Sequence, residues 1–148
     1  KIYTDGAARG NPGPAGWGAI LMTGKKILEI GGRSDHATNN QMELTAAIEG
    51  LKYLKKHKAD LSVEIFADSK YVILGITEWI FNWQKNNWRN AAKKPVMNRE
   101  LWEELFALAE EWKPKWHYVA GHGTDKWNNR ADEIATSFAD NAPVELRK

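Results

Sequence analysis

Residues 65–69 read IFADS, an apolar run typical of a buried strand that ends in a carboxylate, Asp68. Residues 2–6 read IYTDG and repeat this pattern, with Asp5 leading into a glycine-rich loop. If the two strands are neighbours, both carboxylates lie at one edge of a sheet, where open α/β sheets bind their ligands. The two stretches therefore predict a functional site at that edge.

The order of apolar patterns predicts an α/β fold with a mixed sheet. Strands are expected at residues 1–5, 17–23, 26–33, 62–67 and 115–120. Helical spacing of apolar residues occupies 41–57, 70–75, 79–86, 98–111 and 126–140. The first three strands follow one another directly and should be antiparallel. The last two are separated by helices, so they should run parallel, with right-handed crossovers.

Size and composition limit what kind of protein carries the site. The chain has 148 residues, of which 43% are hydrophobic and 27% are charged, which is typical of one globular domain. No apolar run approaches the roughly 20 residues of a membrane helix, and no signal-peptide pattern opens the sequence. The absence of cysteine excludes disulfides and thiolate metal sites. We therefore expect a monomeric, cytoplasmic protein with one domain over residues 1–148.

A basic segment runs from residue 79 to residue 99 and contains no Asp or Glu. Its cations are Lys85, Arg89, Lys93, Lys94 and Arg99, so its charge exceeds the net charge of +2 of the whole chain. Such a run is often only a solvated helix face. Here Trp79, Trp83 and Trp88 are interleaved with it, which is typical of surfaces that bind phosphates and stack on bases or sugars.

Two further carboxylates can join Asp5 and Asp68. Glu43 and Asp132 each lie one turn before an alanine on the apolar, buried face of a predicted helix. Both side chains are therefore expected beside that face and directed toward the sheet. Four carboxylates from four separate elements can then converge. In one cleft they would repel one another and raise one another's pKa, unless divalent cations bind. Oxygen ligands without a His or Cys cluster favour Mg²⁺ or Mn²⁺ over zinc.

Three of the four carboxylates also have a purely structural explanation. Glu43 can be the reciprocal member of a capping box with Asn40, and Asp132 can be a surface charge paired along its helix. Asp5 can be a turn-forming residue before Gly6. The metal-site interpretation therefore depends on the four residues being found together.

Four motifs resemble, in order and spacing, those of the ribonuclease HI family: YTDGAARGNPGPAGWGAI, TNNQMELTAAIEGL, IFADSKYV and GHGTDKWNNRADEIA. The resemblance covers about residues 2–140 and includes the basic protrusion of bacterial members. It implies a ribonuclease H-like fold that hydrolyses the RNA strand of RNA–DNA hybrids, independently of base sequence, leaving 5′-phosphate and 3′-hydroxyl ends. The implied cofactors are two Mg²⁺ ions, with Mn²⁺ as a substitute. The implied metal ligands are Asp5, Glu43, Asp68 and Asp132.

The resemblance also implies roles outside the carboxylate set. His122, between two glycines, matches a histidine that assists proton transfer or product departure. The positions that match readers of the RNA strand in the minor groove, where 2′-hydroxyls lie, are Asn11, Asn39 and Asn40. The positions that match DNA-strand contacts are Thr38, Trp79 and Asn98. The alternative is that Asn11 forms a turn with the following proline and that Asn39 and Asn40 only cap a helix.

Two other functions stay open at this point. A catalytically silent module could bind hybrids without cutting them, but it would not need all four carboxylates. A nuclease of the same fold could act on duplex DNA, but the basic protrusion and the TNNQMEL motif argue against it. A panel of labelled duplexes distinguishes the three functions.

Overall fold

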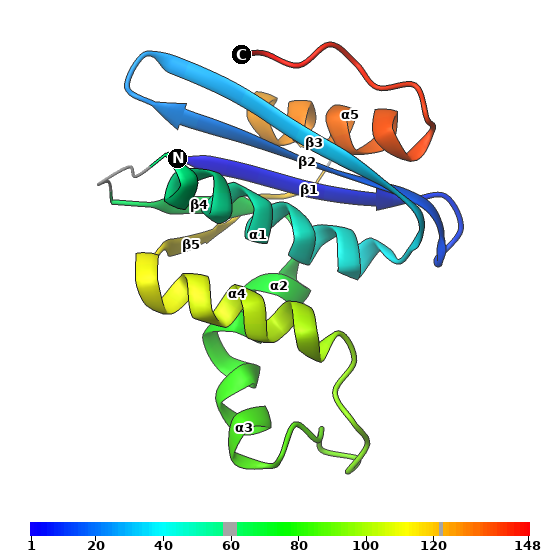
Figure 1. The fold of residues 1–148 in the computed structure, drawn as a ribbon, viewed down its shortest axis with the longest axis vertical. Helices are drawn as coiled ribbons and strands as arrows, with labels where there is room; N and C mark the ends of the chain where they lie inside the picture. Colours follow the sequence, from blue (N-terminus) through cyan, green and yellow to red (C-terminus); the bar gives the residue numbers. More distant parts are fainter. Residues whose placement is uncertain (58–61, 122) are drawn as a thin grey trace.

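The computed structural model describes residues 1–57, 62–121 and 123–148. The described residues form a five-stranded sheet in the order β3-β2-β1-β4-β5 (Figure 1). The strands are β1 (Ile2–Ala8), β2 (Gly13–Thr23), β3 (Lys26–Ala37), β4 (Glu64–Ala67) and β5 (Lys115–Tyr118). β1, β2 and β3 are antiparallel, whereas β4 runs parallel to β1 and β5 parallel to β4. The predicted mixed sheet is therefore confirmed.

Helices cover both faces of the sheet. They are α1 (Asn39–Lys56), α2 (Lys70–Leu74), the π-helical turn η1 (Gly75–Trp79), α3 (Ile80–Lys85), α4 (Arg99–Trp112) and α5 (Lys126–Ala139). In β2, Gly16 and Gly18 meet α5, while Ala19 and Leu21 join the core under α1. Alternate residues of one strand thus face two different helices, as the pleat of a strand requires. Figure 1 shows α5 apart from α1 and α4, across the sheet.

The main core lies between the sheet and α1, α2 and α4. Leu44, Ile48 and Leu51 of α1 are buried there at helical spacing, together with Ile65 of β4 and Trp102 of α4. None of the described helices is long and apolar enough to cross a membrane. The core thus fixes α1 and β4, two of the elements that carry predicted site residues.

The start of α1 is capped by Thr38. Thr38 accepts a hydrogen bond from the backbone N–H of Gln41 (3.1 Å), and the Gln41 side chain accepts one from the N–H of Thr38 (2.9 Å). This reciprocal pair is the capping box, so the alternative in which Glu43 pairs with Asn40 as a cap is wrong. The carboxylate of Glu43 is therefore not used as a cap.

The predicted end of the first strand at Asp5 is also wrong, because β1 continues to Ala8. The ladder with β2 extends through Ala8↔Ala15, and β2 begins at Gly13, four residues before the predicted start. The extension contains glycines, which do not contribute to an apolar pattern, so the pattern does not predict it. A Cβ on Gly6 would lie 2.5 Å from a backbone atom of α1, so glycine at that position allows strand and helix to approach closely.

Two predicted helices, 70–75 and 79–86, are one continuous helical run made of α2, η1 and α3. Gly75 lies where this run crosses α4, and a Cβ there would meet the ring of Trp102 at 2.1 Å. Glycine lets the two helices approach closely at this crossing. The basic loop that follows α3 leads into α4, which begins within one residue of its predicted start.

Candidate active site

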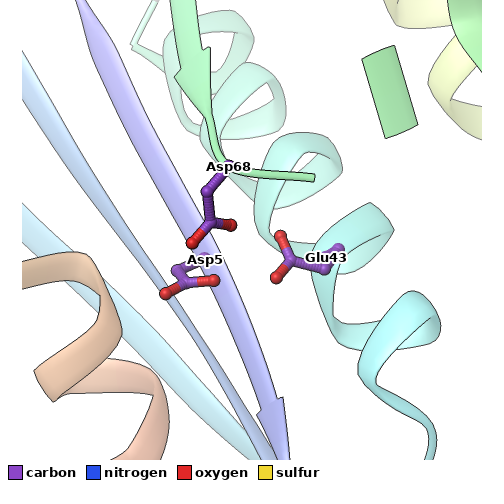
Figure 2. Close-up of side chains that lie close together, drawn as sticks. All are labelled: Asp5, Glu43 and Asp68. Carbon is purple, nitrogen blue, oxygen red and sulfur yellow. The ribbon is translucent and has the colours of Figure 1, made fainter. Parts of the chain in front are cut away.

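Three of the four predicted carboxylates converge at the edge between β1 and β4. Asp5, Glu43 and Asp68 each offer an oxygen, and these atoms lie within 4.8 Å of one another. Figure 2 shows the three side chains pointing toward one another from β1, from α1 and from the end of β4. The parallel pairing of β1 with β4 ends at Thr4↔Ala67, so Asp5 and Asp68 are the next residues along the two strands.

Asp132 lies on α5 at the border of the same pocket. The pocket has a volume of about 420 Å³, and Asp132 lines it together with the three converging carboxylates. Asp132 is half-buried, and its charge helps to raise the pKa of both Asp5 and Asp68. The structure therefore places all four predicted carboxylates in one pocket, three of them in close contact range.

Burial dominates the electrostatics of the cluster. Asp5 is only 3% exposed, and its burial raises its pKa to about 8, with further contributions from the charges of Asp68 and Asp132. Burial and the nearby charge of Asp5 raise the pKa of Glu43 well above its usual value. Burial also raises the pKa of Asp68. Without a counter-charge, the ionised forms of these three groups destabilise the fold.

A hard divalent cation fits this set of ligands. The donor atoms are carboxylate oxygens from rigid elements, which are the ligands that Mg²⁺ and Mn²⁺ prefer. Oε2 of Glu43 is buried and has no hydrogen-bond partner among the described residues. An unpartnered buried oxygen is unfavourable in a fold, and a cation would satisfy it.

Asp68 is also positioned by residues that sequence reasoning missed. A Cβ on Gly121 would lie 2.8 Å from Oδ2 of Asp68, so a side chain at this position would displace the end of this carboxylate. Asn128 of α5 is 1% exposed, and its side-chain amide lowers the pKa of Asp68. Neither amide atom of Asn128 completes a hydrogen bond of ordinary geometry with a described residue. The one signal in the sequence is that Asn128 lies one helical turn before Asp132.

A second pocket, of about 500 Å³, lies beside the first. Its lining includes Asn11, Thr38, Asn40 and Asn98, four of the predicted substrate-binding residues. Asn40 also lines the carboxylate pocket, so the two pockets adjoin. Trp79 is not among the lining residues; it is 38% exposed on η1.

Hydrogen bonds hold the polar side chains of this second pocket in place. Asn98 accepts from the side-chain amide of Gln41 (3.2 Å) and donates to the hydroxyl of Tyr71 (3.1 Å). Oδ1 of Asn11 accepts from the backbone N–H of Asn39 (2.9 Å). The helix cap is Thr38, so the alternative in which Asn39 and Asn40 serve only as caps is wrong.

The basic segment keeps most of its charge unpaired. Arg99 pairs with Glu103 (3.0 Å) and lies over the ring of Trp88 at 5.1 Å. The other four cations of the basic segment form no ion pair with a residue that the structure describes; they are Lys85, Arg89, Lys93 and Lys94. This surface can therefore attract a polyanion.

The predicted catalytic His122 lies outside the described residues.

Comparisons with known proteins agree with this geometry. A family model described as RNase H matches residues 1–140. Ribonuclease H of Bradyrhizobium diazoefficiens is 53% identical over 134 residues, which cover 90% of this chain and 85% of that protein. Ribonuclease H of Thermosynechococcus vestitus is 47% identical over 147 residues, which cover 99% of this chain and 92% of that protein.

Solved structures show the same fold. LC9-RNase H1, a type 1 RNase H with the type 2 active-site motif, has a TM-score of 0.84 at 24% identity, over 99% of this chain and 75% of that one. LC11-RNase H1 in complex with an RNA/DNA hybrid has a TM-score of 0.69 at 29% identity, over 95% and 96% of the two chains. The matched family model and the two bacterial relatives establish that the chain belongs to the RNase H family.

Proposed function

We propose that this protein is an endonuclease that hydrolyses the RNA strand of RNA–DNA hybrids, independently of base sequence, leaving 5′-phosphate and 3′-hydroxyl ends. The observation that carries the proposal is the convergence of Asp5, Glu43 and Asp68 within 4.8 Å in a chain of the RNase H family. LC11-RNase H1, solved in complex with an RNA/DNA hybrid, supports the choice of substrate.

Asp5, Glu43, Asp68 and Asp132 would hold two divalent ions when substrate is present, Mg²⁺ by preference or Mn²⁺ as a substitute. Bound there, such ions lower the pKa of an attacking water and stabilise the charge on the leaving 3′-oxygen. The chain's own contribution is placement. Strand β1 fixes Asp5 and the end of β4 fixes Asp68, while α1 and α5 bring Glu43 and Asp132 to the same pocket.

The carboxylates act in their ionised forms, so the raised pKa of Asp5 makes the reaction depend on pH and on metal concentration together. Burial of Asp5 and Glu43 keeps bulk water away from the ligand oxygens. His122 is proposed to assist proton transfer or product departure. No side chain of the protein needs to act as the nucleophile.

The adjoining pockets give a basis for distinguishing a hybrid from other duplexes. Asn11, Asn39 and Asn40 are proposed to contact the RNA strand in the minor groove, where only RNA carries 2′-hydroxyls. The proposed contacts to the DNA strand are Thr38, Trp79 and Asn98. The basic segment would bind backbone phosphates on the same side. We also propose that the protein acts as a monomer in the cytoplasm.

The decisive experiment uses a hybrid with each strand labelled separately, incubated in Mg²⁺ or in EDTA beside duplex RNA and duplex DNA. Cleavage confined to the RNA strand of the hybrid and abolished by EDTA is the expected result. Binding without cleavage would indicate a silent module, and cleavage of duplex DNA would mean that the substrate is wrong. The Asp68→Asn variant should bind the hybrid without cutting it, and normal cleavage by that variant would contradict the metal-site assignment.

A further inference from the structure

Arg9 lies at the border of the carboxylate pocket, directly after β1 ends at Ala8. Among the described residues that line this pocket it is the one cation, beside the carboxylates of Asp5, Glu43, Asp68 and Asp132. Nothing in the sequence assigns Arg9 a role, because a single arginine in a glycine-rich loop has no distinctive spacing. Its position beside the four carboxylates indicates a role.

The charge of the pocket creates a difficulty for a nucleic-acid substrate. Until metal ions neutralise them, four carboxylates repel the phosphates of a backbone that must pass over them. A guanidinium at the border offsets part of this repulsion, and its planar array of N–H donors matches a phosphate group. Arg9 is therefore placed where an incoming backbone needs attraction.

Asp140 holds the Arg9 side chain in a defined orientation. Nε of Arg9 donates to Oδ1 of Asp140 (2.6 Å) and Nη2 donates to Oδ2 (2.8 Å). A guanidinium has five N–H donors, and this pair uses two of them. The side chain is still 54% exposed, and no other acceptor for it is found among the described residues. Three N–H donors thus stay available to a ligand.

We infer that Arg9 binds a phosphate of the RNA strand next to the scissile position, with Asp140 orienting its guanidinium. This inference rests on the proposed function, because it assumes that the RNA strand crosses the carboxylate pocket. Arg9 would then be a binding residue, acting on affinity and not on the chemical step.

The alternative is that the ion pair merely attaches the loop to the end of α5. Exposed ion pairs add little stability, and another arginine already holds this helix end. Nη1 of Arg33 donates to the carbonyl oxygens of Phe138 (2.9 Å) and Ala139 (2.7 Å). Arg33 does not line the carboxylate pocket. It therefore provides a control that disturbs the same helix end without touching the proposed phosphate site.

The test measures kcat and KM for hybrid cleavage over a salt series with Arg9→Gln, Asp140→Asn and Arg33→Gln. Arg9→Gln should raise KM several-fold at low salt while kcat stays within about twofold. Loss of one phosphate contact lowers the slope of log affinity against log salt by about 0.9, so the KM gap should shrink about threefold between about 50 and 200 mM salt. Asp140→Asn keeps the Arg9 cation and one acceptor oxygen for it, so its KM should rise much less than that of Arg9→Gln and its salt slope should stay that of the wild type. Arg33→Gln should lower Tm with KM unchanged.

Equal increases of KM in Arg9→Gln and Asp140→Asn, with an unchanged salt slope, would overturn the inference and leave only an attachment role. Arg9→Lys keeps the charge, so it should recover most of the slope. Failure of the proposed function is separable, because it would appear as absent cleavage by the wild type. In that case equilibrium binding of the hybrid in EDTA over the same salt series still decides the role of Arg9, since a flatter slope in Arg9→Gln supports it and an unchanged slope refutes it.

Discussion

Replacing Asp5 with asparagine should stabilise the metal-free protein near neutral pH. Burial raises the pKa of Asp5 from 3.8 to about 8. An acid with a higher pKa in the folded state leaves the unfolded chain with fewer bound protons between these two values. Stability is therefore lost as the pH rises from about 4 toward 8, and the loss is absent at low pH. Asparagine keeps the shape of the side chain and removes the titration.

The size of the effect follows from the same pKa. Each pH unit above 3.8 contributes about 1.4 kcal/mol, so the raised pKa of Asp5 lowers the free energy of unfolding by at most about 4 kcal/mol at pH 7. Protons shared among Asp5, Glu43 and Asp68 make the net value smaller, because removing one charge also eases the ionisation of the other two. We expect a gain in the free energy of unfolding of about 2–4 kcal/mol at pH 7 and almost none at pH 4.

Urea unfolding in EDTA between pH 4 and pH 8 measures this prediction directly. Asp35→Asn is the matched control, because its side chain is 95% exposed and the substitution should change stability by less than about 0.5 kcal/mol. An Asp5→Asn variant that is no more stable than the wild type at pH 7 would refute the reasoning, as would a gain that does not vary with pH. Adding Mg²⁺ should stabilise the wild type more than Asp5→Asn.

Two further predictions concern other elements. Gly121→Ala should raise the Mg²⁺ concentration needed for half-maximal cleavage and lower kcat about 10- to 100-fold, because the new Cβ would displace Asp68. Titration of the cleavage rate with Mg²⁺ checks this prediction. A titration curve equal to that of the wild type would contradict it. Glu29→Gln should cost about 1–3 kcal/mol at pH 7, because Arg130 holds the pKa of buried Glu29 below its usual value with bonds of 2.7 and 2.8 Å. That stability is present in full above the usual pKa of 4.5 and is lost as the pH falls through the lower pKa of the folded state. Urea unfolding at pH 3 and pH 7 tests this, and an equal loss at both would contradict it.

The sequence predicts the pairing of Asp5 with Asp68, because two apolar runs that end in aspartate can belong to adjacent parallel strands. It does not predict that β1 continues past Asp5. Gly6 extends the strand without adding to the apolar pattern, and its value lies in the close approach of α1, which is a tertiary contact. The pattern predicted that Asp5 and Asp68 lie close together, and they do. It placed Asp5 at the end of its strand, whereas Asp5 lies in the middle of β1.

The surroundings of the carboxylates were less accessible to sequence reasoning. Gly121 and Asn128 act through their distance from Asp68, and this distance depends on how β5 pairs with β4 and how α5 packs against β1 and β2. Arg9 meets Asp140 across 131 residues of sequence. Residue type and spacing report on periodic elements, whereas such contacts between distant segments arise only when the elements are assembled.

The position of Asp5 in the middle of β1 explains how the fold can hold such an unfavourable cluster. On one side the antiparallel ladder with β2 continues past Asp5 to Ala8, so the backbone cannot relax to carry the carboxylate into water. On the other side the pairing with β4 ends at Thr4, which leaves the side chain beside Asp68. A loop would let these charges separate and lose their shared geometry. The same rigidity that makes the metal-free cluster destabilising therefore keeps its oxygens at a spacing suited to cations. Substitutions that remove a charge from the cluster should gain stability only where they lose catalysis.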